Sequence, residues 1–469
     1  MKNSLVILLS LIVALNTFSQ TLIPKVDKRI EILSIVSRLA EYDEYNQNAA
    51  KKYVADIHAH FDKFKSDTLI GLANNIRQQL GIGFDAVMSM AVNLRSGNKF
   101  TLQDNWKKDL DKRWTQQAAL QFVDLLNQFY TKTKAEIFFS NQADYYNKVT
   151  KAFEQVLSRL HLPWYNSYYG FKPKEKFNIV IGCGNAGANY GPSITIGKDT
   201  KEVYAIMGSW SFDSVGNPVF KEENYLPTLI HEFNHSFINP LLVRYQKNTT
   251  LEISVQKILD TMKVEMDRQS YGNWETVFNE SLVRASVVRY FISNNPDNTK
   301  MIDDEIMQQI TRGFIWTKEL VLLLGVYENN RAKYPDITTF YPNIIDFFKS
   351  TADSFSTIKR NYENNTPRVI SIQPFDNNAQ DIDTSVKEMT INFSHTMTGK
   401  GYSINYGKSG EKFYPVKSVV GYVNNNKGIR IELALKPDTE YEMILTGRAF
   451  KNIEGYPLRN YTIKFKTKK

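Results

Sequence analysis

Two histidines and a glutamate form the pattern in this sequence with the clearest chemical meaning. His231 and His235 are four residues apart, and Glu232 directly follows the first of them. Residues at this spacing lie on one face of a helix, one turn apart. Two imidazoles placed in this way can bind one Zn²⁺ at bond lengths of about 2.0–2.1 Å. Glu232 would lie beside the metal, where it can take a proton from a metal-held water molecule. The pattern is typical of zinc-dependent hydrolases.

The surroundings of this motif make coincidence a poor explanation. Only six histidines occur among the 469 residues. Between Leu226 and Pro240 the only charged residue is Glu232, and most of the other residues are apolar. We therefore expect a largely buried helix that ends near Pro240, because proline breaks helices. In the alternative interpretation, the two histidines are hydrogen-bonded in the core and Glu232 is paired with an arginine or a lysine.

A catalytic zinc site usually has three protein ligands, so a third ligand must lie elsewhere in the chain. The position six residues after His235, where another class of zinc peptidase has a third histidine, is occupied by Leu241. His395 lies far away, in a region whose sequence has the periodicity of strands. Glu280 is the best candidate, because it follows the apolar positions of a second helical segment. An ion pair with Arg284, one helical turn further on, is the alternative role for Glu280. Weaker candidates in more polar surroundings are Glu275, Glu265 and Glu252.

The motif and the downstream Asn279-Glu280 together resemble the gluzincin class of zinc metallopeptidases. The resemblance implies that His231, His235 and Glu280 bind Zn²⁺ and that Glu232 is the general base. Gluzincins often have an aspartate four residues after the ligand glutamate, where it orients a zinc-bound histidine. Arg284 occupies that position here, so the groups that orient the ligands must come from elsewhere. The whole layout also resembles an uncharacterised family of exported Bacteroidota proteins that are predicted peptidases.

Gluzincins also place a tyrosine or a histidine near the oxygen that gains negative charge during the reaction. No suitable histidine remains in this sequence, so the resemblance implies a tyrosine downstream of Glu280. Tyr327 is the first choice, because it follows the apolar run Val321–Leu324 at the end of a helical segment. Tyr334 is the second choice. Packing is the alternative role for either residue, since the chain has 26 tyrosines.

The first 20 residues have the pattern of a secretory signal peptide. A lysine near the start precedes an apolar run from Leu5 to Leu15, and small residues suggest cleavage between Ser19 and Gln20. A lipid anchor would require a cysteine next to the cleavage site, and the sequence has none there. No later apolar run is long enough to span a membrane. We therefore expect an exported protein, periplasmic or extracellular, without a membrane span.

Charge and cysteine content exclude several other functions. The net charge is +9, but the basic residues are scattered and do not form a stripe with interleaved aromatics, so we expect no nucleic-acid partner. Cys183 is the only cysteine, so no disulfide can form within the chain. The letters from Gly182 to Gly187 match a dinucleotide fingerprint, but a strand-like run follows instead of a helix. A glycine-rich turn is the better interpretation of that segment.

The periodicity of the chain indicates an α+β fold with several domains. After the signal peptide, residues 21–165 have helical periodicity and form an α-helical N-terminal region. Residues 166–360 form a mostly helical zincin-like metallopeptidase core, with a small sheet from strands near Phe177–Ile181, Ser193–Ile196 and Val203–Met207. A polar linker at Asn361–Pro367 follows. Residues 367–469 alternate with period two and resemble the bacterial Ig-like β-sandwiches of secreted enzymes.

These expectations combine into two hypotheses of different classes. The first is a secreted zinc metalloendopeptidase-like hydrolase that acts on a peptide or protein substrate, with Glu232 as general base. The second is a secreted binding or adhesion protein whose zincin core is inactive or structural. Two features favour the second hypothesis: Arg284 replaces the aspartate of gluzincins, and Ig-like regions mostly support or bind. A zincin-like fold alone does not determine a function.

Overall fold

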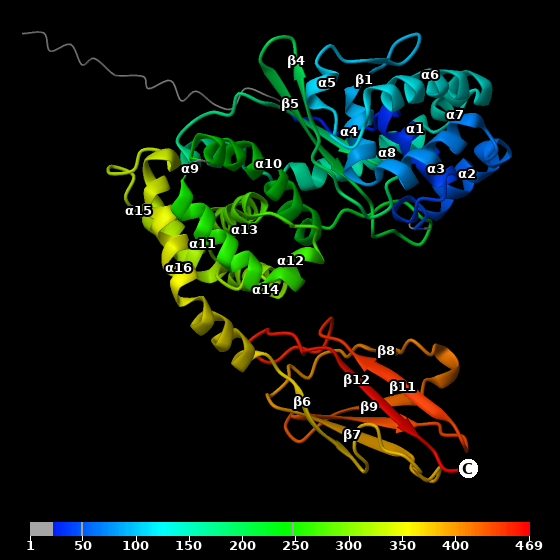
Figure 1. Ribbon diagram of the computed structural model, residues 1–469, viewed down its shortest axis with the longest axis vertical. Coiled ribbons are helices and arrows are strands. Elements are labelled where there is room, and N and C mark those ends of the chain that lie inside the picture. The colour runs from blue at the N-terminus through cyan, green and yellow to red at the C-terminus, as the bar shows by residue number, and fades with distance from the viewer. Residues whose placement is uncertain (1–21, 48–49, 246–247) are drawn as a thin grey trace, which may run out of the picture. The chain divides into compact units, whose positions relative to one another are not determined.

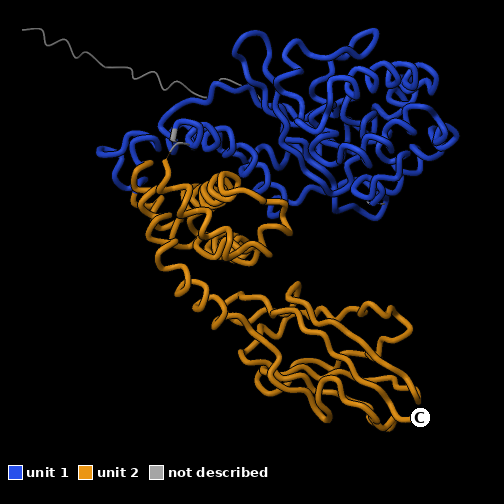
Figure 2. Tube along the Cα trace, in the orientation of Figure 1, with its two compact units in different colours: residues 1–245, 327–340 blue, residues 246–326, 341–469 orange. Residues whose placement is uncertain are grey.

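A computed structural model describes residues 22–47, 50–245 and 248–469, and the signal peptide expected at residues 1–20 lies outside these ranges. The fold is α+β, as the sequence predicts: helices dominate the first three quarters of the chain, and strands dominate the last (Figure 1). The chain divides into two compact units, coloured separately in Figure 2. One contains the chain up to Tyr245 and the segment Tyr327–Phe340, and the other contains Gln246–Val326 and Tyr341–Lys469.

Helices fill most of the N-terminal region, and their ends follow local sequence signals. The Asp27 side chain accepts a hydrogen bond from the backbone of Arg29 and caps the first helix, while Gly81 ends the third in a left-handed conformation. A short hairpin of β1 (Leu94–Arg95) and β2 (Thr101–Leu102) interrupts this helical region. The helices are α1 (Lys28–Leu39), α2 (Lys51–Phe61), α3 (Thr68–Leu80), α4 (Asp85–Asn93), α5 (Trp106–Asp109), α6 (Gln116–Thr133), α7 (Ala135–Asn141), α8 (Ala143–Leu157) and α9 (Leu162–Tyr169).

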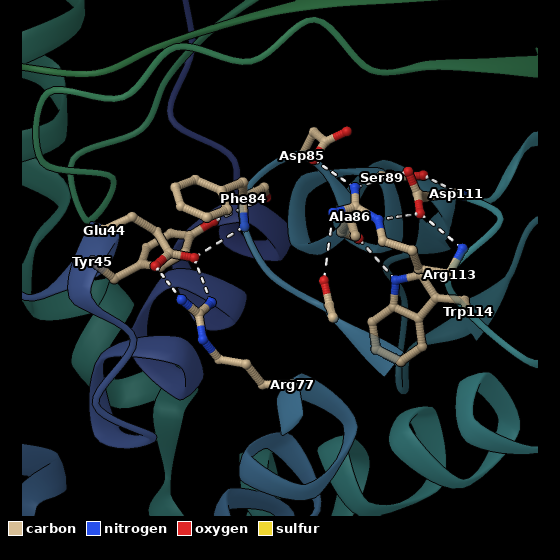
Figure 3. Close-up of polar contacts among 11 residues, drawn as sticks. Glu44, Tyr45, Arg77, Phe84, Asp85, Ala86, Ser89, Asp111, Arg113 and Trp114 are labelled. Atoms are coloured by element: carbon tan, nitrogen blue, oxygen red, sulfur yellow. Dashed lines mark hydrogen bonds and ion pairs between the residues drawn. The ribbon is translucent and has the colours of Figure 1, made fainter. Parts of the chain in front are cut away.

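Charged side chains fasten the starts and ends of these helices to one another (Figure 3). Both terminal nitrogens of Arg77 on α3 donate to the Glu44 carboxylate, at 2.7 and 2.9 Å. The same carboxylate accepts from the backbone N–H of Phe84 at 3.0 Å, just before α4 begins. Arg113 similarly donates to Asp111 at 2.8 Å. Bidentate arginine pairs fix geometry as well as charge, so the Glu44 carboxylate links α3 to the segment that leads into α4.

A three-stranded sheet precedes the motif helix, as the sequence predicts. It consists of β3 (Lys176–Ile181), β4 (Ser193–Ile196) and β5 (Thr200–Met207), in the order β3-β5-β4. The pairing of β3 with β5 is parallel, and that of β4 with β5 is antiparallel. The glycine-rich segment Gly182–Gly187 is a loop between β3 and β4 without a helix, which agrees with a turn and not with a dinucleotide site.

Helices continue from α10 (Glu222–Tyr245) onward, and their ends correct two sequence expectations. Pro240 does not end α10, which runs on to Tyr245; buried Leu241 and Leu242 anchor the turn after the proline and compensate for its missing N–H. The expected linker at Asn361–Pro367 is helical as far as Asn365. The later helices are α11 (Thr249–Thr261), α12 (Lys263–Asp267), α13 (Trp274–Asn294), α14 (Thr299–Thr311), α15 (Thr317–Asn329) and α16 (Ile337–Asn365).

Two antiparallel sheets form the C-terminal β region. One sheet has the order β6-β7-β10-β9 and the other β12-β11-β8. Alternate residues such as Ile391, Ile431 and Phe465 point into one shared apolar core, which agrees with the expected sandwich. The strands are β6 (Val369–Gln373), β7 (Glu388–Phe393), β8 (Ile404–Tyr406), β9 (Val416–Val423), β10 (Gly428–Leu433), β11 (Glu440–Leu445) and β12 (Tyr461–Lys466).

None of the helices in the described ranges is both long enough and apolar enough to cross a membrane.

Candidate metal centre

The two histidines of the motif face each other on α10. Their Nε2 atoms are 3.2 Å apart. Two nitrogen ligands with bonds of about 2.05 Å and a tetrahedral angle at zinc would lie about 3.3 Å apart. The helical i, i+4 spacing therefore sets the two imidazoles at the separation that one tetrahedral metal ion requires.

Glu280 on α13 completes a group of three possible ligands. One ligand atom from each of His231, His235 and Glu280 lies within 4.8 Å of the others. The two imidazoles are half-buried and Glu280 is buried, with 7% of its surface exposed. Nitrogen and carboxylate donors in a set of three match the ligands of catalytic zinc sites. This group can hold a metal ion. The histidines and Glu232 are more exposed than the sequence suggested, which leaves the group open to solvent.

Neighbouring residues on α10 orient the motif. The Nδ1 atom of His235 lies 3.2 Å from Oδ1 of Asn239, one turn further along the helix. A partner on this nitrogen fixes the tautomer that leaves Nε2 available for a metal. Asn234 is fully buried, and its Oδ1 accepts a hydrogen bond from the Tyr169 hydroxyl at 2.9 Å. The helix is therefore held in a fixed rotation about its axis, with both imidazoles on one side.

Glu232 lies against the chain segment that leads into β4. A Cβ atom added at Gly191 would be 2.7 Å from Oε2 of Glu232, so only glycine allows the carboxylate this position. The sheet edge that begins here thus runs beside the carboxylate expected to act as a base. A side chain at position 191 would displace that carboxylate.

Arg284 is the partner of Glu280, as the alternative interpretation of the sequence proposed. Its Nη2 atom lies 2.8 Å from Oε2 of Glu280, and both side chains are almost completely buried. The ion pair does not exclude metal binding, because a carboxylate has two oxygens and several lone pairs. Arg284 occupies the position at which gluzincins have an aspartate, and its carboxylate partner is Glu280.

The Arg284 guanidinium is itself fixed by hydrogen bonds to other polar side chains. Its Nη2 donates to the Tyr271 hydroxyl at 2.8 Å, and its Nη1 donates to Gln309 on α14. Gln309 donates to Glu305, whose pKa is raised by burial. Burial and the charge of Glu280 raise the pKa of Tyr271 to about 12. Sequence reasoning missed Tyr271, Gln309 and Glu305, because their relation to Glu280 depends on how α13 and α14 pack.

The other candidate carboxylates lie outside this group. Among the described residues, the group of possible metal ligands contains His231, His235 and Glu280 only. Glu252 is exposed on α11, and Glu275 and Glu265 are half-buried on α13 and α12.

The hydroxyl of Tyr327 has a structural partner. It donates a hydrogen bond to the backbone carbonyl of Tyr168, and its ring packs against Phe340 and Arg331. Burial raises the pKa of Tyr327 to about 12. The ring of Tyr334 also packs on Phe340, with 4.8 Å between centroids. These contacts support the packing role for both tyrosines, and a catalytic role for Tyr327 stays a prediction.

The comparisons with known proteins place the chain in a family without defining its activity. Residues 22–347 match the model of DUF4932, a domain of unknown function, and the chain belongs to this family. No curated protein matches the chain.

Two solved structures illustrate the structural likenesses. The chain is similar to PcoC, a methionine-rich copper resistance protein from Escherichia coli, with 18% identity over 22% of this chain and 99% of that one, and a TM-score of 0.18. It is also similar to the N-terminal part of the bacterial S-layer protein SbsC, with 14% identity over 56% of this chain and 61% of that one, and a TM-score of 0.17. Likenesses this weak carry no argument about function.

Proposed function

We propose that this protein is an exported zinc metallopeptidase, in which His231, His235 and Glu280 bind the metal and Glu232 is the general base. The observation that carries the proposal is the 3.2 Å separation of the two Nε2 atoms, with a carboxylate of Glu280 close to both. This donor set suits zinc better than calcium or magnesium, which prefer oxygen ligands.

The residues of the chain would share the work of peptide hydrolysis. A bound zinc ion would polarise the substrate carbonyl and acidify a water molecule. Glu232 would take the proton from the attacking water and pass it to the leaving amine. Arg284 would hold the Glu280 carboxylate in place through Oε2.

The free edge of β4 is a suitable place for an extended peptide substrate. Pro192 accepts a hydrogen bond from Tyr204 of β5, so the backbone groups of Gly191 and Ser193 point to the other edge. At Thr195 this edge is already covered, because Asp109 accepts from its N–H and Asn105 donates to its carbonyl. A peptide could therefore add as a strand at residues 191–193, beside Glu232.

A substitution at Glu232 tests the proposal most sharply. Glu232→Gln should retain zinc and lower the cleavage rate of an unfolded protein substrate by about 10²–10⁴-fold, because the general base is lost. Glu223→Gln, on an exposed position of the same helix, is the matched control and should leave the rate unchanged. Full activity of the Glu232→Gln variant would show that Glu232 is not the base.

A binding or adhesion protein with an inactive core is the second candidate function. The observation in its favour is the buried ion pair between Glu280 and Arg284, which gives Glu280 a partner without a metal. Absence of zinc from the purified protein, together with absence of cleavage, would support this function over the first.

A further inference from the structure

A groove lined largely by charged and polar residues lies within the second compact unit. Its volume is about 1210 Å³, and it is lined by the exposed face of α14, the end of α12, the end of α16 and the segment between β11 and β12. The C-terminal β region is fixed to α16 at this point. Asn452 donates to the carbonyl of Asn365 at 3.1 Å, and the backbone of Arg459 donates to that of Pro367 at 3.0 Å.

Cationic side chains from separate segments converge on this groove. Its lining has six cations and two carboxylates, a net charge of +4. The carboxylates are Glu265 and Asp304, and Asp304 is paired with Lys300. Within the described part of the chain, no carboxylate lies within 4.0 Å of the other five cations. These five are Arg268, Arg312, Arg448, Lys451 and Arg459.

Mutual repulsion makes this arrangement of cations electrostatically unfavourable unless an anion binds in the groove. Like charges on opposite walls of a groove repel, and the low-dielectric walls weaken the screening by water. Burial and the positive charge of Arg284 lower the pKa of Arg312, and the carboxylates of Glu305 and Glu280 act in the opposite direction. A cationic surface that served only solubility would be spread over a convex face, where water screens each charge.

The composition of the groove favours one kind of anion. Four of the six cations are arginines, whose planar guanidinium groups bind carboxylates through two parallel hydrogen bonds. Tyr362 is the one aromatic side chain in the lining, and its ring already packs against Tyr456, with 6.0 Å between centroids. The groove thus lacks the stacking surfaces that single-stranded nucleic acids require.

The neutral groups and the two carboxylates of the lining further restrict the kind of anionic ligand that the groove can bind. The hydroxyls of Thr311 and Thr366 already donate to helix carbonyls, so they can only accept from a peptide backbone, while the amide NH2 groups of Gln308 and Asn460 can donate to it. Glu265 and Asp304 would repel a ligand that carries charge at every position. A ligand in which acidic residues alternate with neutral ones can place its neutral residues beside these two carboxylates.

We propose that this groove binds an acidic polypeptide segment through its carboxylates. The groove would recruit a protein partner or substrate independently of the metal, so the inference does not rest on peptidase activity. Its volume exceeds what a single inorganic anion fills, and both walls contribute charges to an extended chain.

Fluorescence anisotropy with the full mature chain tests this inference. The probe is a labelled peptide of roughly ten residues, about 33 Å when extended, in which Glu alternates with Ser. A Gln-Ser peptide of the same length is the neutral control. At low ionic strength we expect the Glu-Ser peptide to bind at least about tenfold more tightly than the Gln-Ser peptide.

Charge-neutralising variants localise the binding. The double variant Arg448→Gln/Arg459→Gln should weaken binding of the Glu-Ser peptide at least about tenfold, because two charge-assisted contacts are lost. Lys408→Gln/Lys412→Gln removes the same charge from exposed positions of the β region outside the groove and should bind like the native chain. Melting curves of both variants check that the fold is retained.

Three outcomes would overturn the proposal. The first is equal binding of the Glu-Ser and Gln-Ser peptides. The second is an equal loss of binding in the groove variant and in the control variant. The third is tighter binding of heparin or of single-stranded DNA than of the peptide, since either would assign the groove to another class of polyanion.

Discussion

Glu31 and Glu280 are both buried carboxylates on helices, but their partners differ. Among the described residues, Glu31 on α1 accepts hydrogen bonds from neutral groups: the Tyr53 hydroxyl at 2.7 Å and the backbone N–H groups of Cys183 and Gly184 at 2.7 and 3.1 Å. Glu280 faces a cation, Arg284, and belongs to the group that contains two imidazoles. Both carboxylates are shielded from water, so burial alone does not mark a functional site.

The difference in partners distinguishes the structural role of Glu31 from the chemical role that we propose for Glu280. Donors from two segments, α2 and the loop after β3, bind the Glu31 carboxylate, which fastens both segments to α1. Burial still raises the pKa of Glu31 to about 7, because the carboxylate loses its hydration and the neutral donors around it compensate only in part. Glu280 has the charge compensation that a permanently ionised metal ligand requires.

The largest effect that this comparison predicts is a pH-dependent stability contributed by Glu31. An unfolded glutamate has a pKa near 4.5, and the folded one near 7. Between these values the folded chain holds a proton that the unfolded chain has released, so the free energy of unfolding falls as the pH rises through this window. The loss amounts to about 3 kcal/mol.

Substitution of Glu31 by Gln isolates this contribution. Position 31 of the Glu31→Gln variant cannot ionise. The melting temperature of the variant relative to that of the native chain should therefore rise between pH 5 and pH 8. Glu154→Gln, on an exposed position of α8, is the control and should follow the native chain. Parallel melting temperatures of Glu31→Gln and the native chain would contradict an elevated pKa of Glu31.

A smaller effect is expected for the metal affinity when Arg284 is replaced. Arg284→Met removes the group that holds Oε2 of Glu280, and loss of such an orienting partner typically lowers metal affinity 10–100-fold. Competition of the protein with a chromogenic zinc chelator measures this change, and Arg360→Met on an exposed position of α16 is the control. An unchanged or tighter affinity would mean that Arg284 competes with the metal for Glu280.

The smallest effect is expected for the hydroxyl of Tyr327. Because that hydroxyl donates to the carbonyl of Tyr168, Tyr327→Phe should cost about 1 kcal/mol of stability, with turnover little changed. Arg331 also donates to this carbonyl, at 3.0 Å, which limits the loss. A turnover lowered about a hundredfold at unchanged zinc content would instead establish Tyr327 as an oxyanion stabiliser.

Local patterns were sufficient to predict much of the fold. The period-two runs around Ile391 and Ile431 are strands, because alternation depends only on adjacent residues, and the short β-like run at Phe177–Ile181 is a strand as well. The i, i+4 spacing brought His231 and His235 together for the same reason. The expected helix end at Pro240 was wrong, since burial of the following leucines outweighs the local cost of a proline.

Contacts between distant segments could not be predicted in this way. Glu31 stands in the apolar run Ile30–Val36, which signals an unusual carboxylate, but its partners at positions 183 and 184 are about 150 residues away. The network from Arg284 to Glu305 likewise requires the packing of α13 against α14. Glu280 could be predicted because its apolar surroundings left few alternatives among the carboxylates.

The zinc content of the purified mature protein tests the central claim most directly. We predict one zinc ion per chain, lost in His231→Ala, in His235→Ala and in Glu280→Ala, and retained in Glu31→Gln because that carboxylate has a structural role. Elemental analysis after dialysis gives the result, with circular dichroism to confirm folding. A native chain without zinc, or retention of zinc in all three ligand variants, would contradict the account.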